Sequence, residues 1–222
     1  MTRSVRRLIA IVLALSSVAR ADDGFLRTVS KLGACFYWPE REYRLHHAPA
    51  SLNGRGFVLP ERQAIEKAMS SWATVASSCS DFRFVMDASL AENRATGGVS
   101  EQENSVLLRT RACDGIVPAS DRCRSKSDTR FDDCGSKYEC WLDDEGPSLL
   151  TLAVTRTNYK PKSGVVTAAD IVFHGSAMPD GRRAQFTTTD VLCDATVLQA
   201  CVKNDVLAIM THEIGHAIGL DH

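Results

Sequence analysis

The sequence predicts a single α+β domain, and three observations lead to this fold class. Apolar residues recur at three- and four-residue spacing in two stretches, which is the period of an amphipathic helix. Several short apolar runs bounded by Gly, Pro, Asn or Asp lie between these stretches and favour strands. The 222 residues contain no internal repeat and no low-complexity linker, so we expect one domain from about Phe25 onward.

The predicted elements begin with a strand region and a long helix. Aromatic residues at 36–38 and the run 43–45 favour strand, with an interruption at Pro39. A helix is predicted from Pro60, because proline is tolerated in the first helical turn. The apolar face of this helix consists of Ile65, Ala68, Met69, Trp72, Val75 and Ala76. Further strands are predicted at 82–86, 105–109, 149–157 and 171–174.

The N-terminus has the features of a secretory signal peptide. Three arginines within 1–7 precede an almost wholly apolar run at 8–19, and Ala19 and Ala21 offer small residues at the positions that a signal peptidase reads. A membrane anchor is disfavoured, because spanning a bilayer takes about 20 apolar residues. We therefore expect cleavage after Ala21 and an exported protein, extracellular or periplasmic, with no stable membrane association.

The charge balance excludes two classes of protein. The chain has 26 basic and 27 acidic residues, and removing the four arginines of the signal peptide leaves 22 basic residues, a net charge of −5. No polybasic region favours nucleic acid as a partner, and no acidic excess is large enough to keep the chain disordered. We expect a mildly acidic, monomeric mature protein.

Eight cysteines all lie in the mature part, where an oxidising compartment favours disulfides. No C-x-x-C occurs, which disfavours a zinc ribbon or a thioredoxin-like redox pair. Eight cysteines allow about 105 pairings, so the sequence does not prove any one of them. Short loops favour Cys113–Cys123, Cys134–Cys140 and Cys193–Cys201, which leaves Cys35 to pair with Cys79.

A polar insertion at about 111–147 holds four of the cysteines, and two short disulfides would order it. Its acidic side chains offer oxygen ligands for Ca²⁺, but no D-x-[DN]-x-[DN]-G loop is present, and a solvated acidic surface is the favoured interpretation. The residues that would bind Ca²⁺ are Asp128, Asp132, Asp133, Asp143, Asp144 and Glu145.

The most specific feature is the segment 212–222, which fits the pattern H-E-x-x-H-x-x-G-x-x-H. Residues four apart lie on one helix face, so His212 and His216 can direct their rings at one ion. Glu213 lies about 100° around the helix from His212, within reach of a metal-bound water but not itself a ligand. Gly219 can adopt a positive φ that ends the helix and returns His222 to the same ion.

Three histidines and one water make a catalytic zinc site, because the fourth position stays exchangeable. The alternative, that these are surface histidines spaced this way by chance, is disfavoured by the matching Glu and Gly. Asn204 or Asp205 is placed to cap the start of this second helix. The remaining histidines, His46, His47 and His174, are expected to be surface or loop residues.

With these residues the chain resembles the metzincin zinc metallopeptidases, and the run 205–222 looks most like the matrixin branch in its secreted bacterial form. Weaker resemblance covers the helix with Ala68 and Trp72, the strand 152–155 and the segment 169–173. The resemblance implies a zincin fold: a twisted mixed sheet, a long backing helix and an active-site helix. It also implies that 149–157 is an edge strand above the cleft, where an extended substrate adds by β-augmentation.

The function implied for residues 22–222 is that of a secreted zinc endopeptidase acting on proteins or peptides. His212, His216 and His222 would bind one Zn²⁺, and Glu213 would be the catalytic base. The chain departs from the family pattern in two ways. It has no Pro-Arg-Cys-Gly segment to block the zinc, and no turn with a methionine follows His222.

Met178 and Met210 precede the third ligand and cannot supply that methionine. We therefore expect a frayed His222, weak zinc binding and poor cleavage unless further residues follow it. The alternative function is a non-catalytic exported relative that binds zinc or protein partners without cutting them.

Overall fold

The computed structural model describes residues 26–47, 59–87, 104–121, 123, 132–141, 151–176, 184–188 and 203–222. The expected signal peptide at 1–21 lies outside these residues. The same holds for all six suggested calcium ligands: Asp128, Asp143, Asp144 and Glu145 lie outside these residues, as do the side chains of Asp132 and Asp133. None of the helices in the described ranges is long and apolar enough to cross a membrane.

Five strands form the central sheet, in the order β3-β2-β4-β6-β5. They are β2 (Glu42–His47), β3 (Arg83–Asp87), β4 (Asn104–Arg109), β5 (Ala153–Tyr159) and β6 (Val166–His174). The pairs β2 with β3, β2 with β4 and β4 with β6 are parallel, whereas β5 is antiparallel to β6. The predicted α+β class is confirmed and the sheet is mixed. The strand predicted at 149–157 corresponds to β5, which lies at one edge.

Two small pairs of strands stand apart from this sheet. β1 (Leu26–Arg27) is antiparallel to β9 (Leu220–Asp221), and β7 (Gln185–Thr187) is parallel to β8 (Lys203–Asp205). Residues 36–38, expected as strand, make only isolated contacts: Tyr37 bridges Val165. The positive φ of 50° at Arg41, shortly after Pro39, turns the chain before β2 begins.

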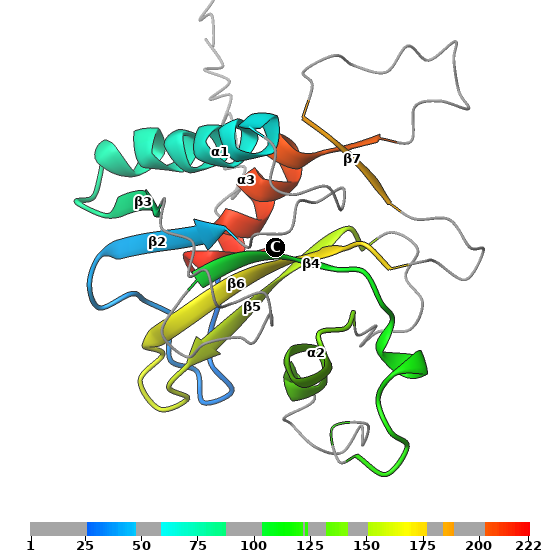
Figure 1. The fold of residues 1–222 in the computed structure, drawn as a ribbon. Helices are drawn as coiled ribbons and strands as arrows, with labels where there is room; N and C mark the ends of the chain where they lie inside the picture. The colour runs from blue at the N-terminus through cyan, green and yellow to red at the C-terminus, as the bar shows by residue number, and fades with distance from the viewer. Residues whose placement is uncertain are drawn as a thin grey trace, which may run out of the picture.

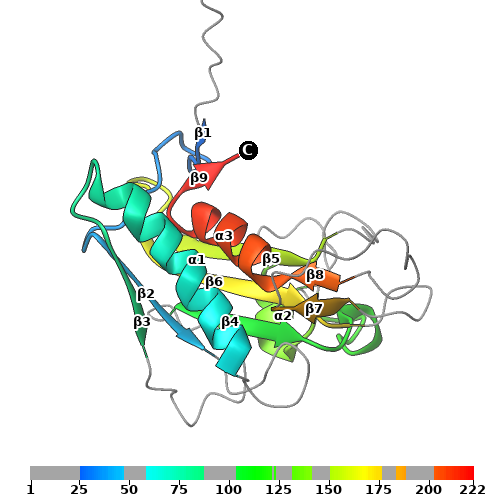
Figure 2. The ribbon, with the colours of Figure 1, turned by 90° about the horizontal axis from the view of Figure 1, so that it is seen from above.

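Two helices cover one face of the sheet. Figures 1 and 2 show α1 (Leu59–Ser77) and α3 (Val206–Ala217) side by side on this face. The core between the helices and the sheet contains Tyr43, Leu45, Ile65, Ala68, Ile171, Phe173, Met210 and Ile214, all fully buried. Val75, expected on the apolar face of α1, is 60% exposed. At about 100° per residue it lies at the margin of the apolar stripe.

The two helices approach closely at a glycine of α3. A Cβ on Gly215 would lie 3.1 Å from the Trp72 ring, which is tighter than ordinary van der Waals contact. The Trp72 indole N–H also donates to the Thr211 carbonyl at 2.7 Å. Packing against α1 therefore favours glycine at position 215, although the histidine motif allows any residue there.

The opposite face of the sheet carries the disulfide-linked insertion, with η1 (Cys113–Gly115) and α2 (Asp132–Tyr138), which Figure 1 shows below the sheet. Its disulfides are Cys113–Cys140 and Cys123–Cys134, with Cα separations of 4.9 and 5.2 Å. The predicted pairs Cys113–Cys123 and Cys134–Cys140 are therefore wrong.

The physical reason is that the two ends of the insertion pair with each other. Ala112 and Trp141 form a β-bridge, and the Cys113 N–H donates to the Trp141 carbonyl at 2.8 Å. This brings Cys113 to Cys140 and leaves the inner two cysteines to pair, so the disulfides are nested rather than sequential.

The predicted Cys35–Cys79 disulfide is also wrong, because both cysteines are exposed and neither forms a disulfide. The Cys35 carbonyl lies against Gly164, in the connection between β5 and β6. Cys79 follows α1 and precedes β3, at the opposite edge of the sheet. The remaining predicted pair, Cys193–Cys201, lies outside the described residues.

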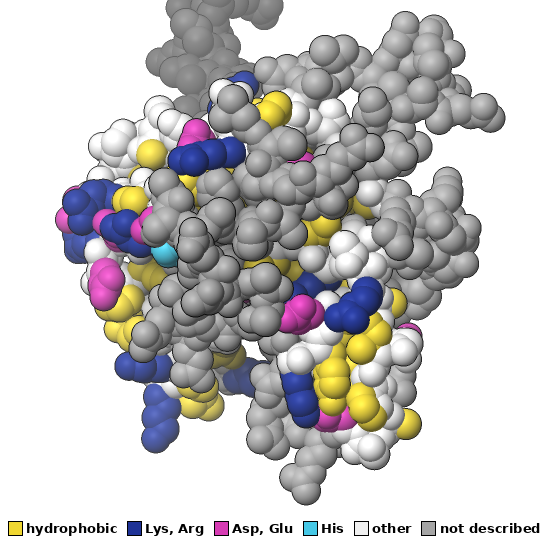
Figure 3. Space-filling view, viewed as in Figure 1, with side chains coloured by type: hydrophobic (Ala, Val, Ile, Leu, Met, Phe, Trp, Pro, Cys, Tyr) yellow, Lys and Arg dark blue, Asp and Glu magenta, His cyan; other side chains and the backbone are white. Residues whose placement is uncertain are grey.

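The charged side chains visible in Figure 3 are interspersed in sign. Several pair across the described surface, such as Arg41 with Asp81 and Arg62 with Glu66. Such exposed pairs are screened by solvent and contribute little to stability.

Candidate metal centre

The helix α3 presents the histidine motif, and both of its ends are held. At its start, the Asp205 carboxylate accepts from the backbone N–H groups of Leu207 at 3.1 Å and Ala208 at 3.2 Å, as predicted for an N-cap. Near its end, the Trp38 indole N–H donates to the Ala217 carbonyl at 2.8 Å. This satisfies a carbonyl that the helix itself leaves without a partner.

The three predicted metal ligands come together. His212, His216 and His222 each offer a ring nitrogen, and these nitrogens lie within 4.8 Å of one another. His212 and His222 are exposed and His216 is half-buried, so an ion could reach them from solvent. Among the residues that the structure describes, this is the one group of His, Cys, Asp or Glu side chains arranged to hold a metal ion.

The spacing of two of these nitrogens fits a metal ion. The Nε2 atoms of His212 and His216 are 3.1 Å apart. Two nitrogens bound to a tetrahedral Zn²⁺ at about 2.0–2.1 Å lie about 3.3 Å from each other. A small movement of either ring would therefore place both Nε2 atoms at ligand distance from one ion.

A backbone contact fixes which nitrogen His216 presents. Its Nδ1 lies 2.9 Å from the Leu220 carbonyl oxygen. A carbonyl only accepts, so Nδ1 carries the proton and the Nε2 lone pair faces the other histidines. Such a second contact sets the tautomer and orientation of a metal-ligating histidine.

The turn at Gly219 brings the third histidine back. Gly219 has a φ of +93°, as its position in the motif predicts. Its N–H donates to the His216 carbonyl at 2.9 Å, and its carbonyl accepts from the Thr28 N–H at 2.9 Å. A Cβ at this position would also come within 3.3 Å of the Phe36 backbone oxygen.

The residue before His222 is held by a strand that sequence reasoning missed. Asp221 pairs with Leu26 and Leu220 pairs with Arg27, so β9 is anchored to a segment about two hundred positions earlier in the chain. β9 therefore holds the chain up to Asp221, the residue before the third ligand. The signal for β1 in the sequence is weak, because only two residues pair.

The electrostatic setting favours the neutral form of His212. Partial desolvation lowers the pKa of His212 below its ordinary value. The neighbouring Glu213 carboxylate opposes this shift, whereas His216 and His222 add to it. Neutral imidazole is the form that ligates metal ions.

Glu213 lies beside the histidines but is only 5% exposed. Its Oε2 accepts a hydrogen bond from the Thr155 hydroxyl, whose oxygen is 2.7 Å away. The same hydroxyl oxygen is 2.9 Å from the Glu213 backbone carbonyl. Thr155 carries no signal in the sequence that marks it as a site residue, although it lies in the strand expected to border the cleft.

Another histidine with polar partners is buried, contrary to the expectation of a surface residue. His174 is 4% exposed, stacks on Trp141 at 4.4 Å and lies 2.7 Å from the Ser176 hydroxyl. Its Nδ1 donates to the Thr151 carbonyl at 3.1 Å. Ser176 is 2% exposed, so this Ser–His pair is out of reach of a substrate.

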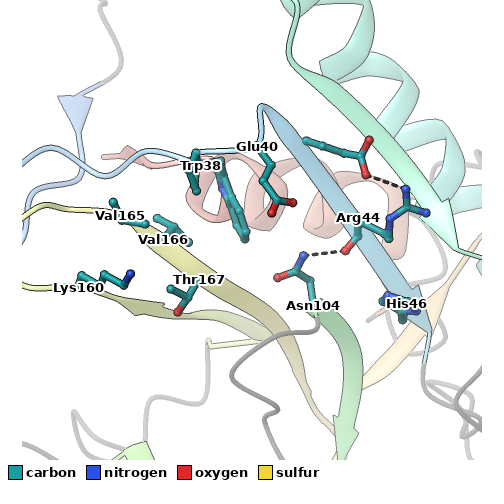
Figure 4. Close-up of a pocket in the computed structure, with 11 residues that line it drawn as sticks. Trp38, Glu40, Arg44, His46, Asn104, Lys160, Val165, Val166 and Thr167 are labelled. Carbon is teal, nitrogen blue, oxygen red and sulfur yellow. Dashed lines mark hydrogen bonds and ion pairs between the residues drawn. The ribbon is translucent and has the colours of Figure 1, made fainter.

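A pocket of about 620 Å³ lies apart from the histidines, on the sheet face turned away from α1 and α3 (Figure 4). The pocket opens between β2 and β6, in the part of the sheet that lies before the first residue of β4. Asn104 bridges the gap there, since it donates to the Arg44 carbonyl at 2.7 Å and accepts from the Ala169 N–H at 2.8 Å. The other polar groups that line it include Glu42, Lys160 and His46.

Comparisons with protein-family models, with curated proteins and with solved structures find no match to this chain. The site therefore has to be interpreted from its own geometry.

Proposed function

We propose that the protein is a secreted, zinc-dependent endopeptidase of the metzincin type, similar to the matrixins. The observation that carries this proposal is the convergence of three histidine nitrogens within 4.8 Å, next to a carboxylate on the same helix. Nitrogen ligands from three histidines leave one tetrahedral position exchangeable, which is the arrangement of catalytic rather than structural zinc sites.

The residues present fit a zinc ion. His212, His216 and His222 would hold it, and His216 is already oriented by the Leu220 carbonyl. Bound there, Zn²⁺ would lower the pKa of a water toward about 7 and polarise the carbonyl of the bond to be cut. Glu213 would be the residue that accepts a proton from a water at the site and gives it to the leaving amine.

The substrate would be an extended peptide. β5 is one of the two edge strands of the described five-stranded sheet and contacts α3 through Thr155. A peptide pairing with the outer edge of β5 would run past the histidines, and backbone hydrogen bonds would align its scissile bond.

The export proposal draws on the N-terminal pattern and on the two disulfides of the insertion, which suit an oxidising compartment.

The test separates metal binding from catalysis. Purified residues 22–222 are loaded with one equivalent of Zn²⁺ and incubated with casein, with and without a chelator. We expect chelator-sensitive cleavage, and Glu213→Gln should keep its zinc affinity but lose turnover. Should the wild type bind zinc tightly yet leave casein and a peptide library intact, the non-catalytic alternative would replace this proposal.

A further inference from the structure

The contact between Thr155 and Glu213 joins two elements far apart in the sequence. Thr155 lies in the middle of β5, where it pairs with Ile171 of β6. Its hydroxyl oxygen lies within 2.9 Å of both a side-chain oxygen and the backbone carbonyl of Glu213. The hydroxyl has one proton for these two acceptors, and the shorter of the two contacts is the one to the carboxylate.

We propose that Thr155 is a positioning residue that holds the Glu213 carboxylate in the orientation needed for proton transfer, an inference that rests on the proposed peptidase function. A hydrogen bond to an ionised carboxylate is shorter and stronger than one between neutral groups. A β-branched side chain in a strand is stiff at χ1, so Thr155 offers its hydroxyl from a fixed position.

The strand that carries Thr155 gives this contact a second consequence. β5 is the edge strand along which an extended substrate would pair. Thr155, which belongs to this strand, is half-buried against α3. Substrate alignment and the placement of the proton acceptor would therefore depend on the same strand. A shift of β5 would move both together.

Both hydrogen-bond contacts of the Thr155 hydroxyl go to Glu213, whereas the metal ligands have supports of their own. His216 is oriented by Leu220, and β9, which leads to His222, is held by β1. Loss of the Thr155 hydroxyl should therefore leave zinc affinity unchanged, which distinguishes a positioning role from a general weakening of the site.

The test compares zinc-loaded wild type with Thr155→Val, which removes the hydroxyl, and with Thr155→Ser, which keeps it. We expect Thr155→Val to lower kcat by about 10- to 100-fold, with KM and zinc affinity within about twofold of wild type. Thr155→Ser should restore most of the activity. Thr155→Ala is measured beside them, so that a folding defect in one variant does not decide the result.

A readout independent of activity is the crystal structure of each zinc-loaded form. The Glu213 carboxylate should keep one orientation in wild type and Thr155→Ser, and should turn away or spread over several rotamers in Thr155→Val. An unchanged carboxylate, an unchanged kcat, a rise in KM alone, or an equal loss of zinc affinity would overturn the inference. An inactive wild type would refute the peptidase function, and the crystal structures would then decide the role of Thr155 alone.

Discussion

Replacing Gly219 by alanine should weaken metal binding, because this residue shapes the turn to the third histidine. Its φ of +93° lies where residues with a Cβ are strained, at a cost of about 1–3 kcal/mol. An added Cβ would in addition lie 3.3 Å from both the Cβ and the backbone oxygen of Phe36. The turn can relieve this strain in the metal-free protein by releasing β9.

Metal binding would then have to restore the strained turn, since Leu220 orients His216 and the turn places His222. Strain of about 1–3 kcal/mol corresponds to an affinity for Zn²⁺ that is about 5- to 150-fold weaker. Competition with a chromophoric chelator at fixed pH measures this directly.

Gly33→Ala is the matched control. Gly33 also has a positive φ, of +81°, but a Cβ there meets nothing within 4 Å. It should lower the unfolding temperature by a similar backbone effect and leave zinc affinity at the wild-type value. The reasoning is refuted if Gly219→Ala binds zinc as tightly as Gly33→Ala does.

Substitutions at three further positions test the supports of the site and of the core. Thr28→Pro removes the N–H that donates to Gly219 and should weaken zinc binding several-fold, whereas Thr28→Ala, which keeps the N–H, should not; equal affinities would contradict a role for this contact. Asp205→Ala should destabilise the protein by about 1 kcal/mol in urea unfolding through loss of the α3 cap, and Asp205→Asn by less. Burial, with the nearby Asp170 charge adding, raises the pKa of Tyr43 well above its ordinary value, so the neutral form is favoured in the folded state. The contribution of Tyr43 to stability should be fully present below pH 10. Above pH 10 the free energy of unfolding should fall by up to about 1.4 kcal/mol per pH unit, and Tyr43→Phe should reduce that slope.

The part of the site that could be predicted from sequence is the part made by local rules. Helix periodicity places His212 and His216 on one face, an acidic residue caps α3, and a glycine supplies the positive φ that ends it. These features depend only on residues within a few positions of each other.

The features that sequence reasoning missed all depend on tertiary contacts. Thr155 is 58 positions from Glu213, and nothing in the strand itself marks it as a partner of that carboxylate. The nested disulfides follow from the bridge between Ala112 and Trp141, which a preference for short loops cannot foresee. The position of His174 at a strand end predicts a surface residue, but the disulfide-linked insertion covers it, with Trp141 stacked on its ring.

The contact between β1 and β9 links the proposed export of the protein to its metal site. Cleavage after Ala21 would leave Leu26 and Arg27 in the mature chain, where they pair with the two residues before His222. Processing beyond Thr28 would remove this strand and the hydrogen bond to Gly219, although it would leave all three histidines in place. The position of the mature N-terminus, and not only the histidine motif, would therefore determine how well the third ligand is held.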